Sequence, residues 1–537
     1  MTVSLKQSRI LIVDDFQSMR TMLREIVKSM GVVTADTASN GKEALSRLRA
    51  NKYDIVICDY NLGAGQNGQQ ILEESKLCNY IGVSTIWVMV TAEKTVDMVM
   101  GAAEVKPDDY LLKPINQALL ESRLEKQILR KKSLGGIEAA ISARDYLAAI
   151  AECDVQLRGQ ALNPQEILRI KSDLLLSIGN YDAAKILFIS VLANRAVAWA
   201  KTGLGKIHFY AKEYELAKEV FQDVLKENRM YMEASDWLVK ALEALGDSHQ
   251  AQQVLLEAVK LSPNSPTRQK ILGDTAFKNG AMAIAQAAFE KNIKISEFSP
   301  HKNPSVYTGL AKVFSAQDEP DEALKILTQS KRDFKDNPEA ALQTAATESV
   351  IYKKMGQLDN AEAAMAEAEQ LMQALDGKVS HEAGLEMARS LFALGKKDKA
   401  LGLLRDVVKN NHENAEILHQ VESVFESEKS TEEGQSLIKE SQLEVININN
   451  QAVMLAKKGE FLEGAQLLRA AVLNLPNSEV MIMNLSGLLI GLMSKEGKNQ
   501  RMALEVSELL DRVRELNPAN KKHPLYVMAL ARMMSAG

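Results

Sequence analysis

Hydrophobic and polar positions follow two different patterns along this chain of 537 residues. In the first quarter, short apolar runs bounded by polar residues alternate with segments that have helical spacing. Such runs are typical of strands buried on both faces, as in a parallel sheet. We predict these strands at 9–14, 32–36, 54–59, 85–91 and 108–112. Five strand–helix units predict a doubly wound, five-stranded parallel α/β sheet with right-handed crossovers.

The fourth helical segment of this first region is predicted from the spacing of Val96, Val99 and Met100. After Lys131 the strand pattern ends, and helical spacing continues through the rest of the chain. The domain boundaries are therefore predicted as 1–131 for the α/β domain and 141–537 for an all-α domain. A linker is expected at 132–140, because Gly135-Gly136 is expected to interrupt a charged helical tail there.

The helical part contains an internal repeat. Small residues recur at intervals of 33 to 39 positions, with one last interval of 64. They are Ala149, Ala184, Ala217, Ala251, Ala285, Ala323, Ala361, Ala400 and Gly464. Most follow a glycine five positions earlier, and a large apolar residue such as Phe188 comes four positions later. A period near 34 with this residue order matches the tetratricopeptide repeat (TPR), a helix pair that stacks into a solenoid.

Two irregularities interrupt this repeat. The proline-containing segment 299–304 predicts an insertion, because proline cannot continue a helix. The 64-residue interval predicts an irregular helix pair around 411–440.

Polar side chains stand at the ends of four of the predicted strands: Asp14 and Asp15 after the first, Asp59 at the end of the third, Thr91 at the end of the fourth and Lys113 after the fifth. In open parallel sheets, ligands bind outside the carboxyl ends of the strands. Three acids, a hydroxyl and a lysine gathered at one edge predict a site for a divalent cation and a phosphoryl group.

With these positions in order, residues 5–131 resemble the receiver domain of bacterial two-component response regulators, which has a flavodoxin-like fold. The resemblance implies that Asp59 accepts a phosphoryl group from the phosphohistidine of a sensor kinase or of a histidine phosphotransferase. It implies that Asp14, Asp15, Asp59 and the backbone carbonyl of Asn61 hold Mg²⁺. A receiver that had lost its chemistry would usually lack the acceptor or one of the acids, and this chain keeps them all.

The same resemblance assigns the remaining site residues. Thr91 and Lys113 contact the phosphoryl group, and Tyr110 is the aromatic residue that changes position with Thr91 when the switch operates. Such an element with two positions is what a switch requires. Pro114 after Lys113 predicts a cis peptide that directs the lysine, because cis bonds occur mainly before proline.

One departure from the receiver pattern lies in the loop 62–68. The family usually has a proline shortly after the acceptor and a glycine eight positions after it. This chain has no proline there, and Gly68 comes nine positions after Asp59. The loop is predicted to be one residue longer and more flexible, and its effect on kinase docking or on phosphoryl lifetime stays open.

Composition and charge exclude several classes of function. The net charge of −5 gives no basic field for nucleic acid, and no segment reaches the 18 apolar residues of a membrane span. The chain begins without the pattern of a signal peptide, and its three cysteines lack metal spacing, so a cytoplasmic protein is expected. No basic recognition helix follows the receiver, and no second catalytic domain is visible. We therefore expect no enzyme beyond the receiver's own phosphorylation and dephosphorylation chemistry.

The output is then expected to be protein binding through the TPR groove. Trp199 and Trp237 fall near groove positions and would anchor a partner, although packing between neighbouring helices is the alternative. The domain order resembles that of regulators that modulate their own phosphorelay, so the partner would be a kinase or a sister regulator. The alternative is a TPR scaffold in which the receiver is a docking module that works without phosphorylation. A homodimer stays open.

Overall fold

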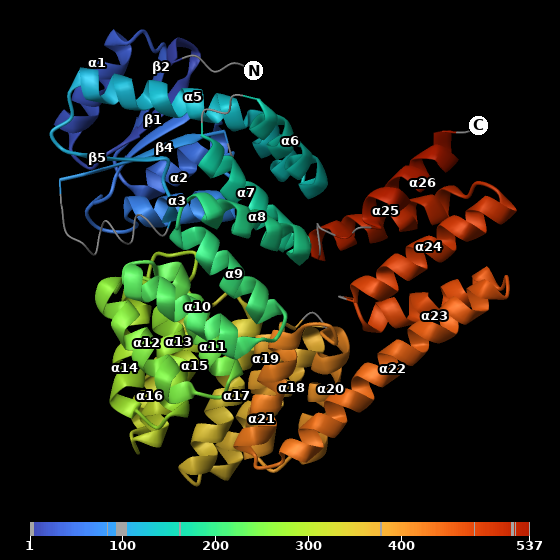
Figure 1. Ribbon diagram of the computed structural model, residues 1–537. Coiled ribbons are helices and arrows are strands. Elements are labelled where there is room, and N and C mark those ends of the chain that lie inside the picture. The colour runs from blue at the N-terminus through green and yellow to red at the C-terminus, as the bar shows by residue number, and fades with distance from the viewer. Residues whose placement is uncertain are drawn as a thin grey trace. The chain divides into compact units, whose positions relative to one another are not determined.

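The computed structural model describes residues 5–82, 84–92, 105–159, 163–375, 379–476, 478–516, 520 and 522–535. The chain forms two compact units, Met1–Val306 and Tyr307–Gly537 (Figure 1). The first unit contains the α/β domain and the first helical repeats, and the only regular elements in the described residues of the second are helices.

The α/β domain is built on the predicted parallel sheet. Its strands are β1 (Arg9–Val13), β2 (Thr34–Ala38), β3 (Ile55–Asp59), β4 (Ile86–Thr91) and β5 (Asp109–Leu112). They are ordered β2-β1-β3-β4-β5, and every neighbouring pair is parallel. Each strand lies within two residues of its predicted range. Because β3 is at the centre and buried along its whole length, its last residue, Asp59, emerges at the middle of the carboxyl edge.

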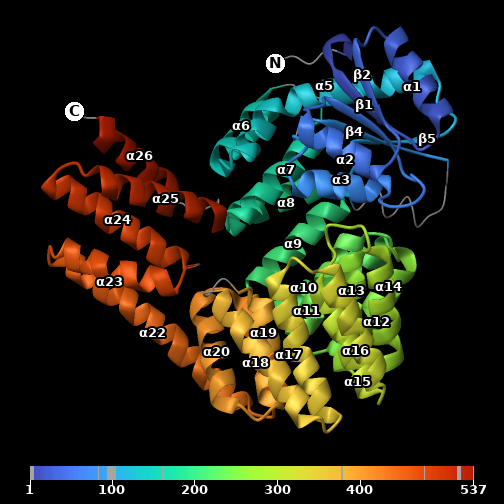
Figure 2. The ribbon, with the colours of Figure 1, turned by 180° about the vertical axis from the view of Figure 1, so that it is seen from behind.

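Helices cover both faces of this sheet (Figure 2). A short 3₁₀ helix, Leu5–Gln7, precedes β1, and α1 (Gln17–Ser29) and α5 (Gln117–Ser142) share one apolar core with the sheet. On the other face, α2 (Gly41–Ala50) and α3 (Gly68–Leu77) form the second core. The prediction of a doubly wound fold is confirmed. The helical segment predicted at Val96, Val99 and Met100 lies outside the described residues.

Helix α5 connects the sheet domain to the repeats without a break. It runs through Gly135-Gly136, so the interruption predicted there is wrong, and the expected linker 132–140 is helical. A Cβ atom on Gly136 would lie 2.9 Å from the Glu152 Oε1 of the next helix, α6 (Tyr146–Arg158). The glycine thus allows α6 to approach closely, and Leu134 and Ile137 of α5 belong to the first apolar core of the repeats.

The repeats of the first unit are helix pairs of 13 or 14 residues per helix. After α6 they comprise α7 (Pro164–Ser177), α8 (Tyr181–Asn194), α9 (Ala198–Tyr210), α10 (Tyr214–Glu227), α11 (Met232–Ala244), α12 (Ser248–Leu261), α13 (Pro266–Lys278) and α14 (Met282–Ile295). The predicted insertion 299–304 lies between α14 and α15 (Pro304–Ala316).

The repeating small and large residues pack these helices closely. The small residue Ala217 is fully buried, and so is Phe221, the large residue four positions later. A Cβ on Gly205 of α9 would lie 2.4 Å from the Phe221 ring. The tight turns between paired helices use glycine in the left-handed region, as at Gly179 with φ of 65°.

The second unit continues the helical pairs. Its helices after α15 are α16 (Pro320–Asp333), α17 (Pro338–Lys354), α18 (Leu358–Ala374), α19 (His381–Ala393), α20 (Lys397–Asn410), α21 (Ala415–Ser427), α22 (Thr431–Lys457), α23 (Phe461–Asn474), α24 (Glu479–Glu496), α25 (Gln500–Leu516) and α26 (His523–Ser535). None of the helices in the described part of the chain is long and apolar enough to cross a membrane.

The 64-residue interval in the repeat has a structural explanation. An irregular pair was expected around 411–440, but α21 and α22 are regular helices, and α22 is 27 residues long. Gly434 of α22 follows Ala400 by 34 positions and precedes Gly464 by 30. A Cβ on Gly434 would lie 2.6 Å from the Phe425 ring of α21, so Gly434 is the small residue of a further repeat, which the sequence pattern did not predict. The next repeat begins on the same helix, without an intervening turn.

Candidate phosphoacceptor and metal site

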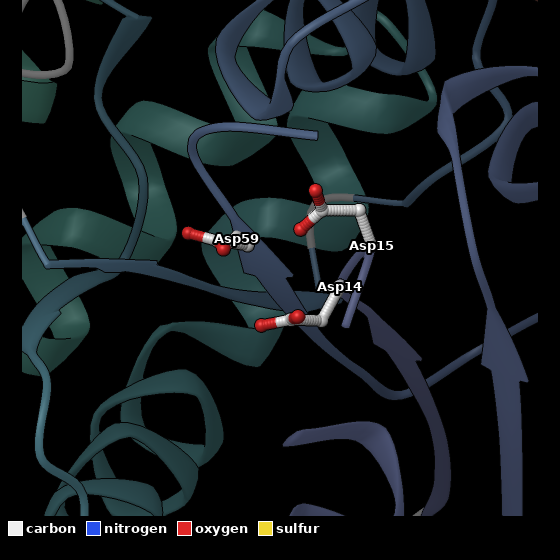
Figure 3. Close-up of side chains that lie close together, drawn as sticks. All are labelled: Asp14, Asp15 and Asp59. Carbon is white, nitrogen blue, oxygen red and sulfur yellow. The ribbon is translucent and has the colours of Figure 1, made fainter. Parts of the chain in front are cut away.

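Three carboxylates meet at the carboxyl edge of the sheet. Asp14 and Asp15 follow β1, and Asp59 ends the neighbouring strand β3. One oxygen from each lies within 4.8 Å of the others, as the convergence of the three side chains in Figure 3 shows. Asp14 is 1% exposed and Asp59 is 6% exposed, so their negative charges are held close together with little water.

Lys113 brings a positive charge into this cluster. Its Nζ donates to the Asp14 Oδ2 at 2.8 Å and to the Asp59 Oδ2 at 2.7 Å. The pairing of Thr91 with Leu112 across β4 and β5 places Lys113 just beyond the edge of the sheet. Its backbone N–H donates to the Thr91 carbonyl at 2.8 Å. The Lys113–Pro114 peptide is cis, as the sequence predicts.

Burial and charge shift the pKa values of the central pair. Burial raises the pKa of Asp59, and the negative charge of Asp14 adds to this, while the hydrogen bond from Lys113 opposes it. For Lys113, burial by itself favours the neutral amine, but the bonds to Asp14 and Asp59 leave its pKa raised. One lysine therefore compensates only part of the negative charge of three carboxylates.

The remaining charge fits a divalent cation. Among the described residues, the buried Asp15 Oδ1 has no hydrogen-bond partner. Carboxylate oxygens are the ligands that Mg²⁺ prefers, and it commonly keeps several waters besides one or two carboxylates. The Asn61 backbone N–H lowers the pKa of Asp59 through a hydrogen bond, so Asn61 lies beside the acceptor, where its carbonyl was predicted to serve as a ligand.

Thr91 lies on β4, which is next to the acceptor strand β3, and Tyr110 lies on β5, one strand further along the sheet. Thr91 ends β4 and is 2% exposed. Tyr110 pairs with Met89 in the β4–β5 register, and its half-buried ring packs against the core formed with α2 and α3. The predicted exchange of positions between these two side chains stays a prediction.

Two residues that the sequence reading did not assign support the acidic loop. Arg20 of α1 donates to the carbonyls of Asp14 and Asp15 at 2.6 and 2.9 Å. The backbone N–H of Phe16 donates to the Asp14 Oδ1 at 2.9 Å. Arg20 follows Asp15 by five positions, and this spacing alone carries no recognisable motif, so only the folded chain reveals its role.

The two tryptophans are far from this site in sequence, and both are half-buried. Trp199 packs edge-on against Phe188, with ring centroids 6.1 Å apart. Trp237 contacts Phe209 at 5.4 Å, and Lys206 and Lys240 lie 5.3 and 5.2 Å from the centre of its ring. In this structure both tryptophans pack against residues of neighbouring helices, as the alternative interpretation expected. Their role as partner anchors stays a prediction.

Known proteins resemble the two parts of the chain separately. A family model described as the response regulator receiver domain matches residues 10–125. Two tetratricopeptide repeat models match residues 233–265 and 382–411. Chemotaxis protein CheY-3 of Vibrio cholerae is 30% identical over 121 residues, which cover 22% of this chain and 92% of that protein. Chemotaxis protein CheY of Pseudomonas aeruginosa is 30% identical over 118 residues, covering 22% of this chain and 94% of that protein.

Solved structures are also similar to parts of the chain. Vibrio cholerae chemotaxis protein CheY4 is 24% identical with a TM-score of 0.21, covering 22% of this chain and 98% of that one. The crystal structure of MamA is 19% identical with a TM-score of 0.28, covering 32% of this chain and 95% of that one. The chain belongs to the response regulator family through its receiver domain, which TPR helices follow.

Proposed function

We propose that this chain is a phosphorylation-dependent regulator of a two-component phosphorelay. The observation that carries the proposal is the buried cluster of Asp14, Asp15 and Asp59 with Lys113 at the carboxyl edge of the sheet. A sensor histidine kinase or a histidine phosphotransferase supplies the phosphoryl group. Phosphoryl transfer depends mainly on positioning and charge stabilisation, and these residues supply both.

In the proposed reaction, a carboxylate oxygen of Asp59 attacks the phosphorus atom of the phosphohistidine. A P–O bond forms as the P–N bond breaks, and the leaving imidazole takes up a proton from water. Lys113, 2.7 Å from the Asp59 Oδ2, donates to a phosphoryl oxygen, and the Thr91 hydroxyl donates to another. Asp14, Asp15, Asp59 and the Asn61 carbonyl would hold Mg²⁺, which would supply positive charge near the transferred group. This is switching chemistry, so we do not class the chain as an enzyme.

The TPR helices supply the output by binding another protein, and a kinase or a sister regulator of the same relay is the proposed partner. The net charge of −5 gives no support for DNA binding. No helix of the described chain suits a membrane, and we place the protein in the cytoplasm.

The test is incubation of the full chain with acetyl phosphate and Mg²⁺, followed by intact mass. We expect one phosphoryl adduct on the wild type and none on Asp59→Asn; a wild type without an adduct would sink the proposal. Partner capture with and without phosphorylation then separates a switch from a scaffold. If the wild type captures the same partners to the same extent with and without phosphorylation, and Asp59→Asn captures as much as the wild type, the receiver is a docking module.

A further inference from the structure

The loop that follows the phosphoacceptor contacts a repeat helix more than 200 positions away. Within the first unit, the Gln66 Nε2 donates to the Phe298 carbonyl at 3.0 Å, and the Gln70 Nε2 donates to the Ile295 carbonyl at 3.1 Å. Gln66 belongs to the lengthened loop 62–68, and Gln70 lies in the first turn of α3. The helices concerned are α3 and α14 (Figures 1 and 2).

One accepting carbonyl lies where a helix needs donors, and the other lies in the turn after that helix. Ile295 is the last residue of α14, and the last four carbonyls of a helix have no partner within it. The Gln70 amide supplies a donor for one of them, and Gln66 holds a carbonyl of the turn that follows. The receiver thus caps the end of a solenoid helix.

Gln66 is held in place from two other sides. Its amide also donates to the Glu74 Oε2 at 2.7 Å, and Glu74 is itself paired with Arg49 at 3.0 Å. A Cβ on Gly41, at the start of α2, would lie 2.8 Å from the Gln66 Cβ, so the loop is packed against α2. The receiver's own structure therefore positions the Gln66 amide that bonds the Phe298 carbonyl.

Asp59 is connected to this contact through backbone packing. A Cβ on Gly68 would lie 2.3 Å from the Asp59 carbonyl oxygen, so α3 starts directly against the acceptor. The Gln70 Oε1 accepts the Asn67 N–H at 3.0 Å while its Nε2 bonds α14, so one side chain joins the start of α3 to the solenoid. A shift of the Asp59 backbone has to move Gly68, and with it Gln70.

The other attachment of the receiver to the repeats is of a different kind. Helix α5 passes into the repeats without a break, and Arg130 bonds Glu166 of α7 at 2.5 Å and Asp108 at 2.9 Å. The Asp108 Oδ2 in turn accepts the backbone N–H of Trp87 in β4 at 2.9 Å. A continuous helix with a charged network forms a fixed joint, whereas the α14 contact consists of two uncharged hydrogen bonds and is the easier one to release.

We propose that the contact of Gln66 and Gln70 with the end of α14 is an intramolecular latch that opens when Asp59 carries a phosphoryl group. The inference rests on the proposed function, because it needs a phosphoryl group at Asp59. The lengthened loop is then the output contact of the receiver, and the repeats move about the fixed joint at Arg130 when the latch opens.

The test is a distance between two spin labels in the full chain, measured with and without Mg²⁺ and beryllofluoride as the phosphoryl stand-in. One label goes on the native Cys78, which is exposed at the end of α3, and the other on an introduced Glu290→Cys at an exposed position of α14. Cys58 and Cys153 are buried, so labelling should be confined to the chosen pair. We expect beryllofluoride to lengthen the distance.

Variants separate the latch from other causes. Gln66→Met with Gln70→Met keeps the side-chain length and removes both amide donors, so the long distance should be present without beryllofluoride. Gln156→Met is the matched control, because the Gln156 Nε2 donates to Glu152 of its own helix, and it should behave as wild type. An unchanged wild-type distance in protein that acetyl phosphate does phosphorylate overturns the latch alone. Failure to form the phosphoryl adduct overturns the proposed function itself.

Discussion

Buried carboxylates occur in both parts of the chain, but their surroundings differ. In the receiver, Asp14, Asp15 and Asp59 lie together with one compensating lysine, Lys113. In the second unit, the carboxylate of Glu386 in α19 is paired with a lysine and a hydroxyl. The Lys312 Nζ lies 2.6 Å from its Oε2, and the Thr347 hydroxyl donates to its Oε1 at 3.2 Å.

The pKa values respond in opposite directions. Burial raises the pKa of Asp59 and the partners only partly offset it. Burial also acts to raise the pKa of Glu386, but Lys312 and Arg389 outweigh it, so the net shift is downward. A carboxylate whose charge is matched within the protein serves structure, whereas a cluster with excess charge is prepared for a ligand that supplies the missing positive charge.

The largest difference should appear in phosphorylation. Asp59→Asn removes the only proposed nucleophile and should abolish the adduct formed with acetyl phosphate and Mg²⁺, read by intact mass. Glu386→Gln changes a carboxylate of similar burial that has no role at the sheet edge, so its adduct should equal that of the wild type. A clear loss of adduct in the Glu386 variant would contradict the assignment of that residue to structure.

The variant Glu386→Gln, which should not change phosphorylation, should instead lower the stability of the second unit. Glu386→Gln leaves Lys312 without its charged partner, and breaking a buried ion pair costs about 3 kcal/mol; we take the lower end because Lys312 is partly exposed. Hydrogen exchange of the most protected amides of α17 and α19 measures this loss. The receiver amides of β1 and β3 should keep their protection, which makes them the internal reference.

The pH dependence of this loss has a defined sign. The folded-state pKa of Glu386 lies below its ordinary value of 4.5, so the ion pair contributes fully above that value. Its contribution falls as the pH drops from about 4.5 through the folded-state pKa. The stability difference between wild type and Glu386→Gln should therefore shrink in acid, and a difference that grows below pH 4.5 would refute the pairing.

Mg²⁺ should act on the receiver alone. A ligand that binds only the folded state at 100 times its dissociation constant stabilises by about 2.7 kcal/mol. The protection of β1 and β3 amides should rise accordingly, and Asp15→Asn should lose most of the gain because it removes one of the clustered oxygens. The amides of α17 and α19 should not respond, since Glu386 already has its positive partner.

The smallest expected effect concerns the packing of the repeat helices, whose stability depends on the fit of side chains and not on charge. Gly434→Ala puts a Cβ 2.6 Å from the Phe425 ring and should destabilise the helix pair by about 2 kcal/mol. Gly402→Ala in α20 meets nothing within 4 Å and should stabilise by about 1 kcal/mol, because alanine favours the helix. Exchange of α20 and α21 amides measures both, and equal effects would show that the close approach is unimportant.

The sequence predicted the receiver well because its signals are local. The strands β1, β3 and β4 are short apolar runs. Asp59 and Lys113 stand immediately at strand ends, so knowledge of parallel sheets places them together. Arg20 and Glu386 could not be found in this way, because their partners are set by helix packing; Lys312 and Glu386 are 74 positions apart. Gly434 was missed for another reason: its repeat lacks the turn glycine that marks most of the others.

The absence of a turn between the two repeats that share α22 has a consequence for how the second unit unfolds. In most repeat arrays, stability is a sum over units and their neighbours, and a turn between units lets one fray while the next stays folded. Helix α22 belongs to the repeat that contains Gly434 and also to the one that contains Gly464, so no such breakpoint separates them. The helices α21 to α23 should therefore melt as one cooperative block, and this stretch of the array should tolerate a deletion or an inserted residue less well than repeats that a turn separates.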